Sequence, residues 1–131
     1  MIAIDPRQAV PIWKQIEDEI RRMVAIGAYL PGAPVPSVRE LAQILRINPA
    51  TASKAYQRLT EAGVLTVRRG EGTFVAKSPT GPSAKERRES LGGAARRFAA
   101  VAATVGATHE EAMNAIQEAL AKMESGVRNR R

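Results

Sequence analysis

Residues 37–59 read SVRELAQILRINPATASKAYQRL, and this stretch contains two helix starts in close succession. Ser37 and Glu40 fit a capping box, in which the serine hydroxyl accepts a hydrogen bond from the Glu40 amide and the Glu40 carboxylate reaches back to the Ser37 amide. Asn48 is a favourable N-cap, and Pro49 is favourable as the first helical residue. Two short helices joined this tightly predict a helix-turn-helix.

The second of these helices is expected to expose a small, polar and basic surface. Its apolar positions recur at helical spacing and define a buried stripe of Ala52, Ala55, Tyr56 and Leu59. At about 100° per residue, the side chains that point away from this stripe are Ala50, Ser53, Lys54 and Gln57, with Thr51 and Arg58 on the flanks. A face of this kind can enter the major groove of DNA and donate hydrogen bonds to bases or phosphates.

An amphipathic helix is expected upstream of this motif. Apolar residues recur there at helical spacing after Pro11, and Gly27 offers a stop. The proline-rich residues 30–36 cannot be helical and are expected to form an ordered loop. Trp13 and Tyr56 both fall on apolar helical stripes, so we expect them in the core rather than as stacking surfaces.

Residues 64–76 follow the helix-turn-helix and contain two β-prone runs around a basic turn with glycines. This pattern predicts a β-hairpin. Placed after a helix-turn-helix, the hairpin is a wing. Arg68 and Arg69 would lie near its tip and could be directed at the DNA backbone or the minor groove.

Residues 77–83, KSPTGPS, concentrate proline, glycine and serine between two periodic regions and are typical of an exposed linker. The predicted organisation has four parts. They are a winged helix-turn-helix DNA-binding domain over 1–77, a linker over 78–83, a two-helix region over 84–125 and a basic tail over 126–131. The expected fold class is therefore mainly α with a small β-wing.

The two C-terminal helices are expected to form a dimerisation region. Ser83 with Glu86, and Thr108 with Glu111, fit capping boxes, and Gly106 separates the helices. The apolar residues expected at the dimer interface are Leu91, Ala94, Phe98, Val101 and Val105 in the first helix, with Ile116 and Leu120 in the second. Two amphipathic helices cannot bury both apolar faces alone, so a second copy is the simplest partner, giving a two-fold dimer that suits a palindromic operator.

Composition limits the possible functions. The chain has 131 residues and a net charge of +7, which favours a polyanionic partner. With no cysteine and one histidine, it offers no disulfide, thiolate or imidazole cluster, and we expect no metal site, no cofactor and no enzymatic activity. The N-terminus lacks a secretory pattern, and no apolar run approaches the ~20 residues that span a bilayer, so a cytoplasmic protein without a membrane partner is expected.

The motifs together resemble the winged helix-turn-helix transcription regulators of the GntR type. The matching stretches include PIWKQI at 11–16, PSVRELA at 36–42, INPAT at 47–51 and RGEGTFV at 69–75. The Asn-Pro helix start and the short C-terminal part look like the YtrA subfamily, whose members usually dimerise through a small helical tail. The resemblance implies control of a neighbouring transporter operon. We expect a repressor rather than an activator, although the sequence does not decide between the two.

The resemblance also implies which residues contact DNA. They are Arg39, then Asn48, Ala50, Thr51, Ser53 and Lys54 at the start of the recognition helix, and Arg69 before the wing glycine Gly70. Arg68 is added as a candidate because it is a basic residue near the tip of the wing. Three residues depart from the family pattern. Arg46 stands where a turn glycine is common and is expected at positive φ, at a cost of about 1 kcal/mol. Ala50 cannot donate a hydrogen bond, and Ser53 replaces a frequent arginine, so the base preference should differ from that of relatives.

A different class of protein would share the small size and the basic charge. A non-specific nucleic-acid-binding protein, either nucleoid-associated or RNA-binding, is the alternative. Specificity separates the two, because a regulator keeps binding one palindrome in excess competitor DNA at physiological salt. A small-molecule effector is possible but is not indicated, since the residues after the linker are too few for an enclosed pocket.

Overall fold

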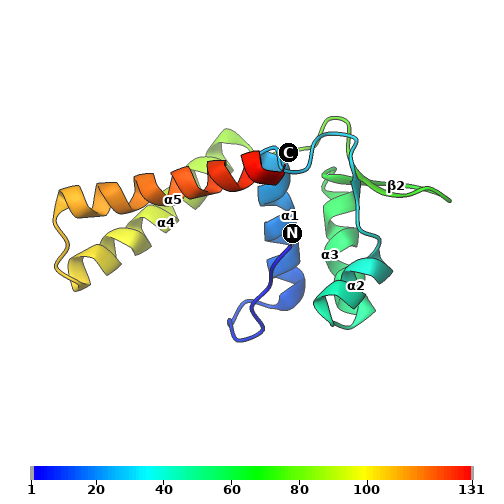
Figure 1. Ribbon diagram of the computed structural model, residues 1–131, viewed down its shortest axis with the longest axis horizontal. Coiled ribbons are helices and arrows are strands. Elements are labelled where there is room, and N and C mark those ends of the chain that lie inside the picture. The colour runs from blue at the N-terminus through cyan, green and yellow to red at the C-terminus, as the bar shows by residue number, and fades with distance from the viewer. Residues whose placement is uncertain (1, 131) are drawn as a thin grey trace. The chain divides into compact units, whose positions relative to one another are not determined.

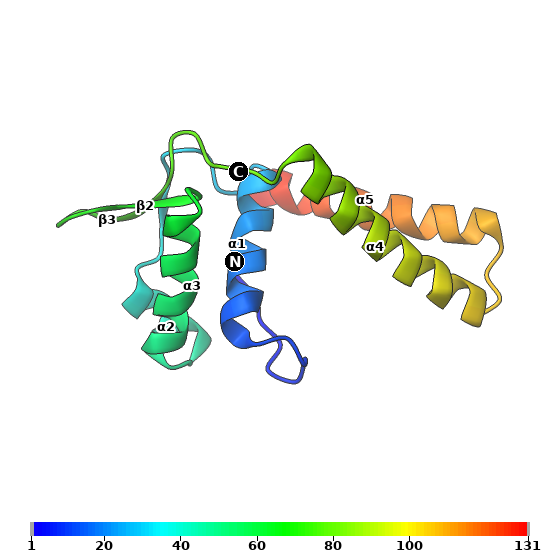
Figure 2. The same cartoon turned by 180° about the vertical axis from the view of Figure 1, so that it is seen from behind.

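The computed structural model describes residues 2–130, with side chains described for residues 2–126. The chain divides into two compact units, Met1–Gly81 and Pro82–Arg131, which are treated separately below. Unit 1 contains the helices α1 (Ile12–Ala25), α2 (Val38–Leu45) and α3 (Pro49–Glu61) and the strands β1 (Pro34–Val35), β2 (Leu65–Arg68) and β3 (Gly72–Val75). Within it α1 and α3 lie side by side, with α2 at one end of α3 and the β2–β3 hairpin extending from the other (Figures 1 and 2). This is a winged helix-turn-helix.

The helix starts in unit 1 form as the local sequence predicts. The Ser37 hydroxyl accepts from the Glu40 amide at 3.0 Å, and the Glu40 carboxylate accepts from the Ser37 amide at 3.4 Å. Asn48 Oδ1 accepts from the Ala50 amide at 2.9 Å, with Pro49 as the first residue of α3. These bonds satisfy amides that a helix leaves without intrahelical partners, and they define where α2 and α3 begin.

The expectation for residues 30–36 was incomplete, because two of them form a strand. β1 pairs with β3 in a three-stranded antiparallel sheet of order β1-β3-β2, with Pro34 opposite Phe74. The Gly32 amide donates to the Val75 carbonyl, and the Val75 amide donates to the Ala33 carbonyl at 2.8 Å. β1 lies at the edge of the sheet, where a proline without an amide hydrogen is tolerated.

The turn between α2 and α3 places Arg46 in the left-handed region, with φ of 55°. This confirms the expectation for Arg46 and makes it the one non-glycine residue with positive φ in the described part of the chain. We expect Arg46→Gly to raise the free energy of unfolding by about 1 kcal/mol in urea denaturation, because glycine adopts this conformation without a steric penalty. Arg46→Ala removes the same charge but keeps the Cβ, so it serves as the control. Equal stability of the two variants would mean that the turn is not strained.

The hydrophobic core belongs entirely to unit 1. Every described side chain classed as buried falls between Ile2 and Val75. The largest fully buried side chains are Ile16, Ile20, Leu41, Leu59 and Val75. They come from α1, α2, α3 and β3, so burying them sets the position of α3 relative to the rest of the domain.

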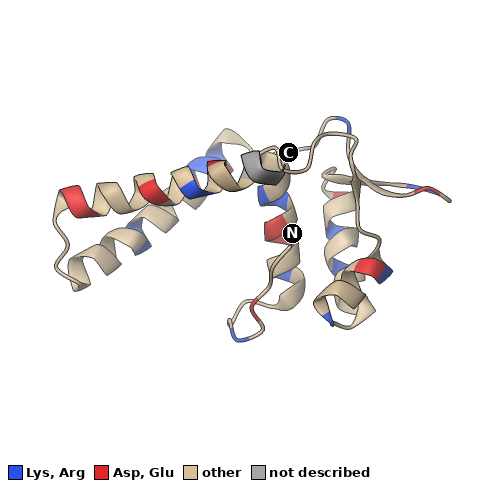
Figure 3. Ribbon diagram, in the orientation of Figure 1, with Lys and Arg blue, Asp and Glu red and all other residues tan. Residues whose placement is uncertain are grey.

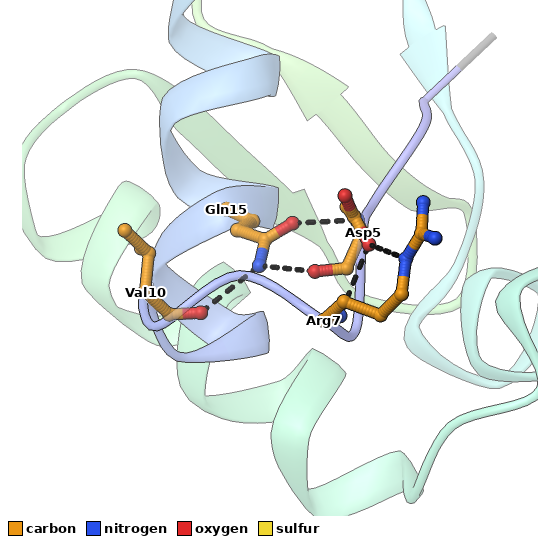
Figure 4. A network of polar contacts seen from close by, with 4 residues as sticks. All are labelled: Asp5, Arg7, Val10 and Gln15. Atoms are coloured by element: carbon orange, nitrogen blue, oxygen red, sulfur yellow. Dashed lines mark hydrogen bonds and ion pairs between the residues drawn. The ribbon is translucent and has the colours of Figure 1, made fainter.

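The N-terminal segment is fastened to α1 by a single glutamine (Figure 4). Gln15 accepts from the Asp5 amide at 2.7 Å and donates to the carbonyls of Asp5 and Val10, each at 2.9 Å. Asp5 in turn pairs with Arg7. These bonds keep the segment beside α1, where Ile2 is only 4% exposed.

Unit 2 is a pair of helices, α4 (Ala84–Thr104) and α5 (His109–Arg130). The Ser83 hydroxyl accepts from the Glu86 amide, and Thr108 and Glu111 exchange both bonds of a capping box. The bonds from Thr108 lower the pKa of Glu111, a fully exposed carboxyl. Gly106, with φ of 69°, lies between the helices as expected.

The expected separate tail over 126–131 was wrong as far as the backbone of residue 130, which still belongs to α5. Gly126 does not end the helix, because one glycine costs only about 1 kcal/mol and no proline follows. The side chains of Arg128 and Arg130, and residue 131 altogether, lie outside the described part of the molecule.

Candidate nucleic-acid interface

The exposed surface of α3 has the composition expected from its sequence. The predicted stripe of Ala52, Ala55, Tyr56 and Leu59 is buried. Ala50, Ser53, Lys54 and Gln57 are exposed, and Thr51 is half-buried. Figure 3 shows basic positions on α3, which the sequence identifies as Lys54 and Arg58. The N-terminal half of α3 therefore presents small and basic side chains to solvent, next to Asn48.

The segment that precedes α2 is tied to α3 through a tyrosine. Tyr56 Oη donates to the Pro36 carbonyl at 2.6 Å. Burial raises the pKa of Tyr56 far above its ordinary value, and Tyr29 and Glu40 raise it further, so the phenol stays a neutral donor. Arg39 follows Pro36 closely and is exposed near the start of α2. The bond thus fixes the chain that carries Arg39 against the helix that carries Lys54.

The wing places its two arginines differently. β2 and β3 pair from Leu65 opposite Val75 to Arg68 opposite Gly72. The Arg68 guanidinium lies 4.0 Å from the centre of the Phe74 ring, so this side chain lies along the hairpin. Arg69 and Gly70 are exposed in the turn, where Gly70 has φ of 78°. Arg69 is the basic residue at the tip of the wing.

A cation–π cluster between α1 and α3 was missed by the sequence analysis. Trp13 packs against the core, as expected, but it is only half-buried, and its ring also lies beneath two cations. Lys54 Nζ is 4.4 Å and the Arg58 guanidinium carbon 4.9 Å from the ring centre. The signal was present as two pairs spaced by four residues, Trp13 with Glu17 and Lys54 with Arg58, but only the docking of α1 on α3 brings the pairs together.

Glu17 anchors the other end of this cluster. It is 3% exposed, its Oε2 accepts from Arg58 Nε at 2.9 Å, and its Oε1 lies 3.6 Å from Arg21. Burial alone would raise the pKa of Glu17. The hydrogen bond from Arg58 and the charges of Lys14, Arg58 and Arg21 outweigh burial, so the pKa of Glu17 lies below its ordinary value.

This shift makes the stability of unit 1 depend on pH. A carboxyl with a lowered pKa in the folded state stabilises the fold above its unfolded pKa, and the contribution is lost as the pH falls through the folded pKa. We expect Glu17→Gln to reduce the free energy of unfolding by about 2 kcal/mol at pH 7 and to have a much smaller effect near pH 3. Urea denaturation followed by the fluorescence of Trp13, the single tryptophan of the chain, measures the free energy of unfolding at both pH values. Glu71→Gln, on the exposed wing, is the control, and an effect of Glu17→Gln that is equal at both pH values would contradict the assignment.

Two other kinds of feature were sought among the described residues. Among them, no group of three or more histidine, cysteine, aspartate or glutamate side chains could hold a metal ion. No described helix has the length and apolar character needed to cross a bilayer. The exposed basic side chains of α2, α3 and the wing are the feature of unit 1 considered next.

Comparison with known proteins identifies the family to which the chain belongs. The family model described as bacterial regulatory proteins, gntR family, matches residues 13–75, from Trp13 in α1 to the end of the wing. A solved structure, YtrA from Sulfolobus acidocaldarius, a GntR-family transcription factor, is 32% identical, with a TM-score of 0.55 over 92% of this chain and 97% of that one. The chain belongs to the GntR family. This confirms the resemblance found in the sequence, and the winged-helix fold class with it.

Other relatives support the GntR assignment in the same region. The HTH-type transcriptional repressor YtrA of Bacillus subtilis is 44% identical over 78 residues, which cover 60% of this chain and 60% of that protein. The DNA-binding domain of AraR in complex with operator ORX1 is 32% identical, with a TM-score of 0.51 over 56% of this chain and 92% of that domain. The chain thus spans less than two thirds of the curated YtrA repressor.

Proposed function

We propose that this GntR-family chain is a sequence-specific DNA-binding transcription regulator that represses from a palindromic operator as a cytoplasmic homodimer, without catalysing a reaction. The observation that carries the proposal is the exposed N-terminal half of α3, small and basic, flanked by Arg39 on α2 and Arg69 on the wing. In this arrangement α3 enters the major groove, with Asn48, Ala50, Thr51, Ser53 and Lys54 toward the DNA. Arg69, Gly70 and Arg68 follow the adjacent backbone or minor groove.

Several comparisons support this reading. The AraR domain that resembles unit 1 is titled as a complex with an operator, and the Bacillus subtilis relative is named a repressor. The net charge of +7 favours a polyanion. The caps of α2 and α3 and the bond from Tyr56 to Pro36 hold the DNA-directed side chains on rigid elements, which suits specific recognition better than non-specific coating.

Dimerisation is part of the proposal because unit 2 leaves an apolar surface uncovered. No residue of α4 is buried. The exposed fractions are 70% for Leu91, 60% for Val101, 71% for Val105, 39% for Ile116 and 57% for Leu120, while Ala94 and Phe98 continue the same seam on α4. Apolar side chains in this number and periodicity are typical of a helix pair that is completed by a second copy.

The specificity of binding tests the proposal. The full chain is incubated with a random-sequence duplex pool, and the duplexes it retains are sequenced. We expect a palindrome, still bound at physiological salt in excess unrelated DNA. Loss of all preference under these conditions would instead support the non-specific nucleic-acid-binding alternative.

A wing variant tests the proposed contacts. Arg69→Ala should weaken binding to the selected palindrome by about tenfold, because a cation is removed from the tip of the wing. Fluorescence anisotropy with a labelled duplex measures this affinity. Lys77→Ala removes an exposed cation beyond the wing and is the control. Equal affinities for the two variants would contradict the assignment of the wing to DNA.

A further inference from the structure

Trp13 provides a neutral surface on α1 for two cations of the recognition helix α3. The two cations differ in their other partners. Arg58 also donates to the buried carboxylate of Glu17, which neutralises it. Lys54 Nζ lies 4.4 Å from the centre of the Trp13 ring, and no carboxylate of the described residues forms an ion pair with it. Arg58 is therefore fixed by the carboxylate of Glu17, whereas Lys54 is fixed by the neutral ring of Trp13.

This difference affects what each side chain can offer to DNA. The face of an indole attracts an ammonium group through its quadrupole but adds no opposite charge. Lys54 is consequently oriented before DNA arrives while its full positive charge stays available. Lysine loses much rotamer freedom when it is fixed, so a residue that orders it in advance reduces the cost of a later contact.

The ring also determines which part of the DNA Lys54 can reach. Trp13 lies on α1, which packs along α3. The ammonium group is drawn toward α1 and away from the middle of the exposed α3 surface, where Ser53 and Gln57 lie. When α3 occupies a major groove, side chains at its border meet the phosphate backbone, whereas base edges face the middle of the helix.

We propose that Trp13 is a positioning residue that holds Lys54 against a DNA phosphate, so that Lys54 supplies affinity and not sequence preference. This inference rests on the proposed DNA-binding role of α3. It assigns the reading of bases to the neighbours of Lys54, Ser53 among them. It also gives Trp13 a role beyond packing, because the ring acts on DNA binding through Lys54.

The salt dependence of binding tests the role of Lys54. The probes are the duplex that the wild-type chain selects from the random pool and an unrelated duplex of equal length. For Lys54→Met, which keeps the alkyl stem, the slope of log K against log salt should fall by about 0.9 for each bound copy. The ratio of affinities for the two duplexes should stay within about twofold of wild type. Lys77→Met is the matched control for a lost surface charge.

A double-mutant cycle tests the role of Trp13. Trp13→Ala should weaken binding to the selected duplex by about two- to fivefold for each bound copy, and Trp13→Phe should recover most of that loss, because phenylalanine also presents a ring face. In the Lys54→Met background, Trp13→Ala should change affinity by less than about twofold. Far-UV circular dichroism and the thermal midpoint show whether each variant is folded. If Trp13→Ala does not fold, the salt dependence of Lys54→Met still tests the role of Lys54.

Each contrary outcome has its own meaning. If Trp13→Ala lowers DNA affinity equally in the wild-type and Lys54→Met backgrounds, Trp13 only packs. If the slope of log K against log salt is unchanged in Lys54→Met, Lys54 touches no phosphate. A collapse of the preference between the two duplexes in Lys54→Met would assign Lys54 to base reading. Any of these overturns the inference while leaving the proposed function intact. A wild-type chain that selects no duplex would overturn the proposed function, and the inference with it.

Discussion

Val101→Glu should convert the proposed homodimer into monomers and weaken binding to the selected palindromic duplex by about a hundredfold. Val101 is 60% exposed on α4, within the apolar seam that we propose a second copy covers. A buried, unpaired carboxylate would strongly oppose that contact. Without the dimer, the second half-site must be filled by an independent molecule, and an avidity gain of about 10²–10⁴ is lost.

Sedimentation velocity and fluorescence anisotropy measure the two consequences of Val101→Glu. Ala103→Glu is the matched control, because Ala103 is also exposed in the last turn of α4 but lies on the side away from Val101. The control should stay dimeric and bind normally. A dimeric Val101→Glu protein would place the contact between copies elsewhere.

A fragment that ends at Gly81 separates dimerisation from folding. All described buried side chains lie between Ile2 and Val75, and the Thr80 amide still donates to the Gly63 carbonyl at 3.2 Å, so the fragment keeps residue 80 and ends one residue later. This fragment should be monomeric, should keep the thermal transition of unit 1 and should bind the palindrome as weakly as Val101→Glu. A fragment that stays dimeric would assign a different role to α4 and α5.

Leu59→Ala should have the largest effect on stability, a loss of about 2–5 kcal/mol in the free energy of unfolding. Leu59 is 0% exposed and comes from α3, so its removal leaves a cavity beneath the recognition helix. A loss of this size lowers the thermal midpoint of a domain of this length by more than about 10 °C. DNA binding should fall with it, because the packing that orients α3 is weakened.

Urea denaturation monitored by Trp13 fluorescence reports on Leu59→Ala within unit 1. Leu30→Ala removes the same number of atoms from a side chain that is 51% exposed, and it should cost much less. Comparable losses in the two variants would mean that the core of unit 1 does not determine its stability.

Much of unit 1 was predictable because its signals are local. The capping residues Ser37, Glu40 and Asn48 act within one turn of their own helix, so the starts of α2 and α3 follow from a few neighbouring letters. The buried stripe of α3 follows from the 3.6-residue period. The positive φ of Arg46 was expected from the resemblance, because a turn glycine is common at this position in the family.

Two of the features that sequence reasoning missed depend on contacts between distant segments. β1 consists of two residues that pair with β3 about forty positions later in the sequence. The proline-rich stretch that contains β1 has no local pattern that predicts a strand. The placement of Lys54 and Arg58 over Trp13 requires the docking of α1 on α3. The roles assigned to the DNA-facing and dimer-facing residues stay predictions, since they concern partners outside the chain.

The confinement of the core to residues 2–75 has a consequence for how such chains can evolve. The family match over 13–75 lies wholly within the segment that packs by itself. Recombination near residues 76–83 would therefore exchange the C-terminal helices without opening a cavity among the buried side chains of unit 1. Such an exchange would alter the contact between copies that we propose for α4 and α5, while the packing that orients α3 stays as it is.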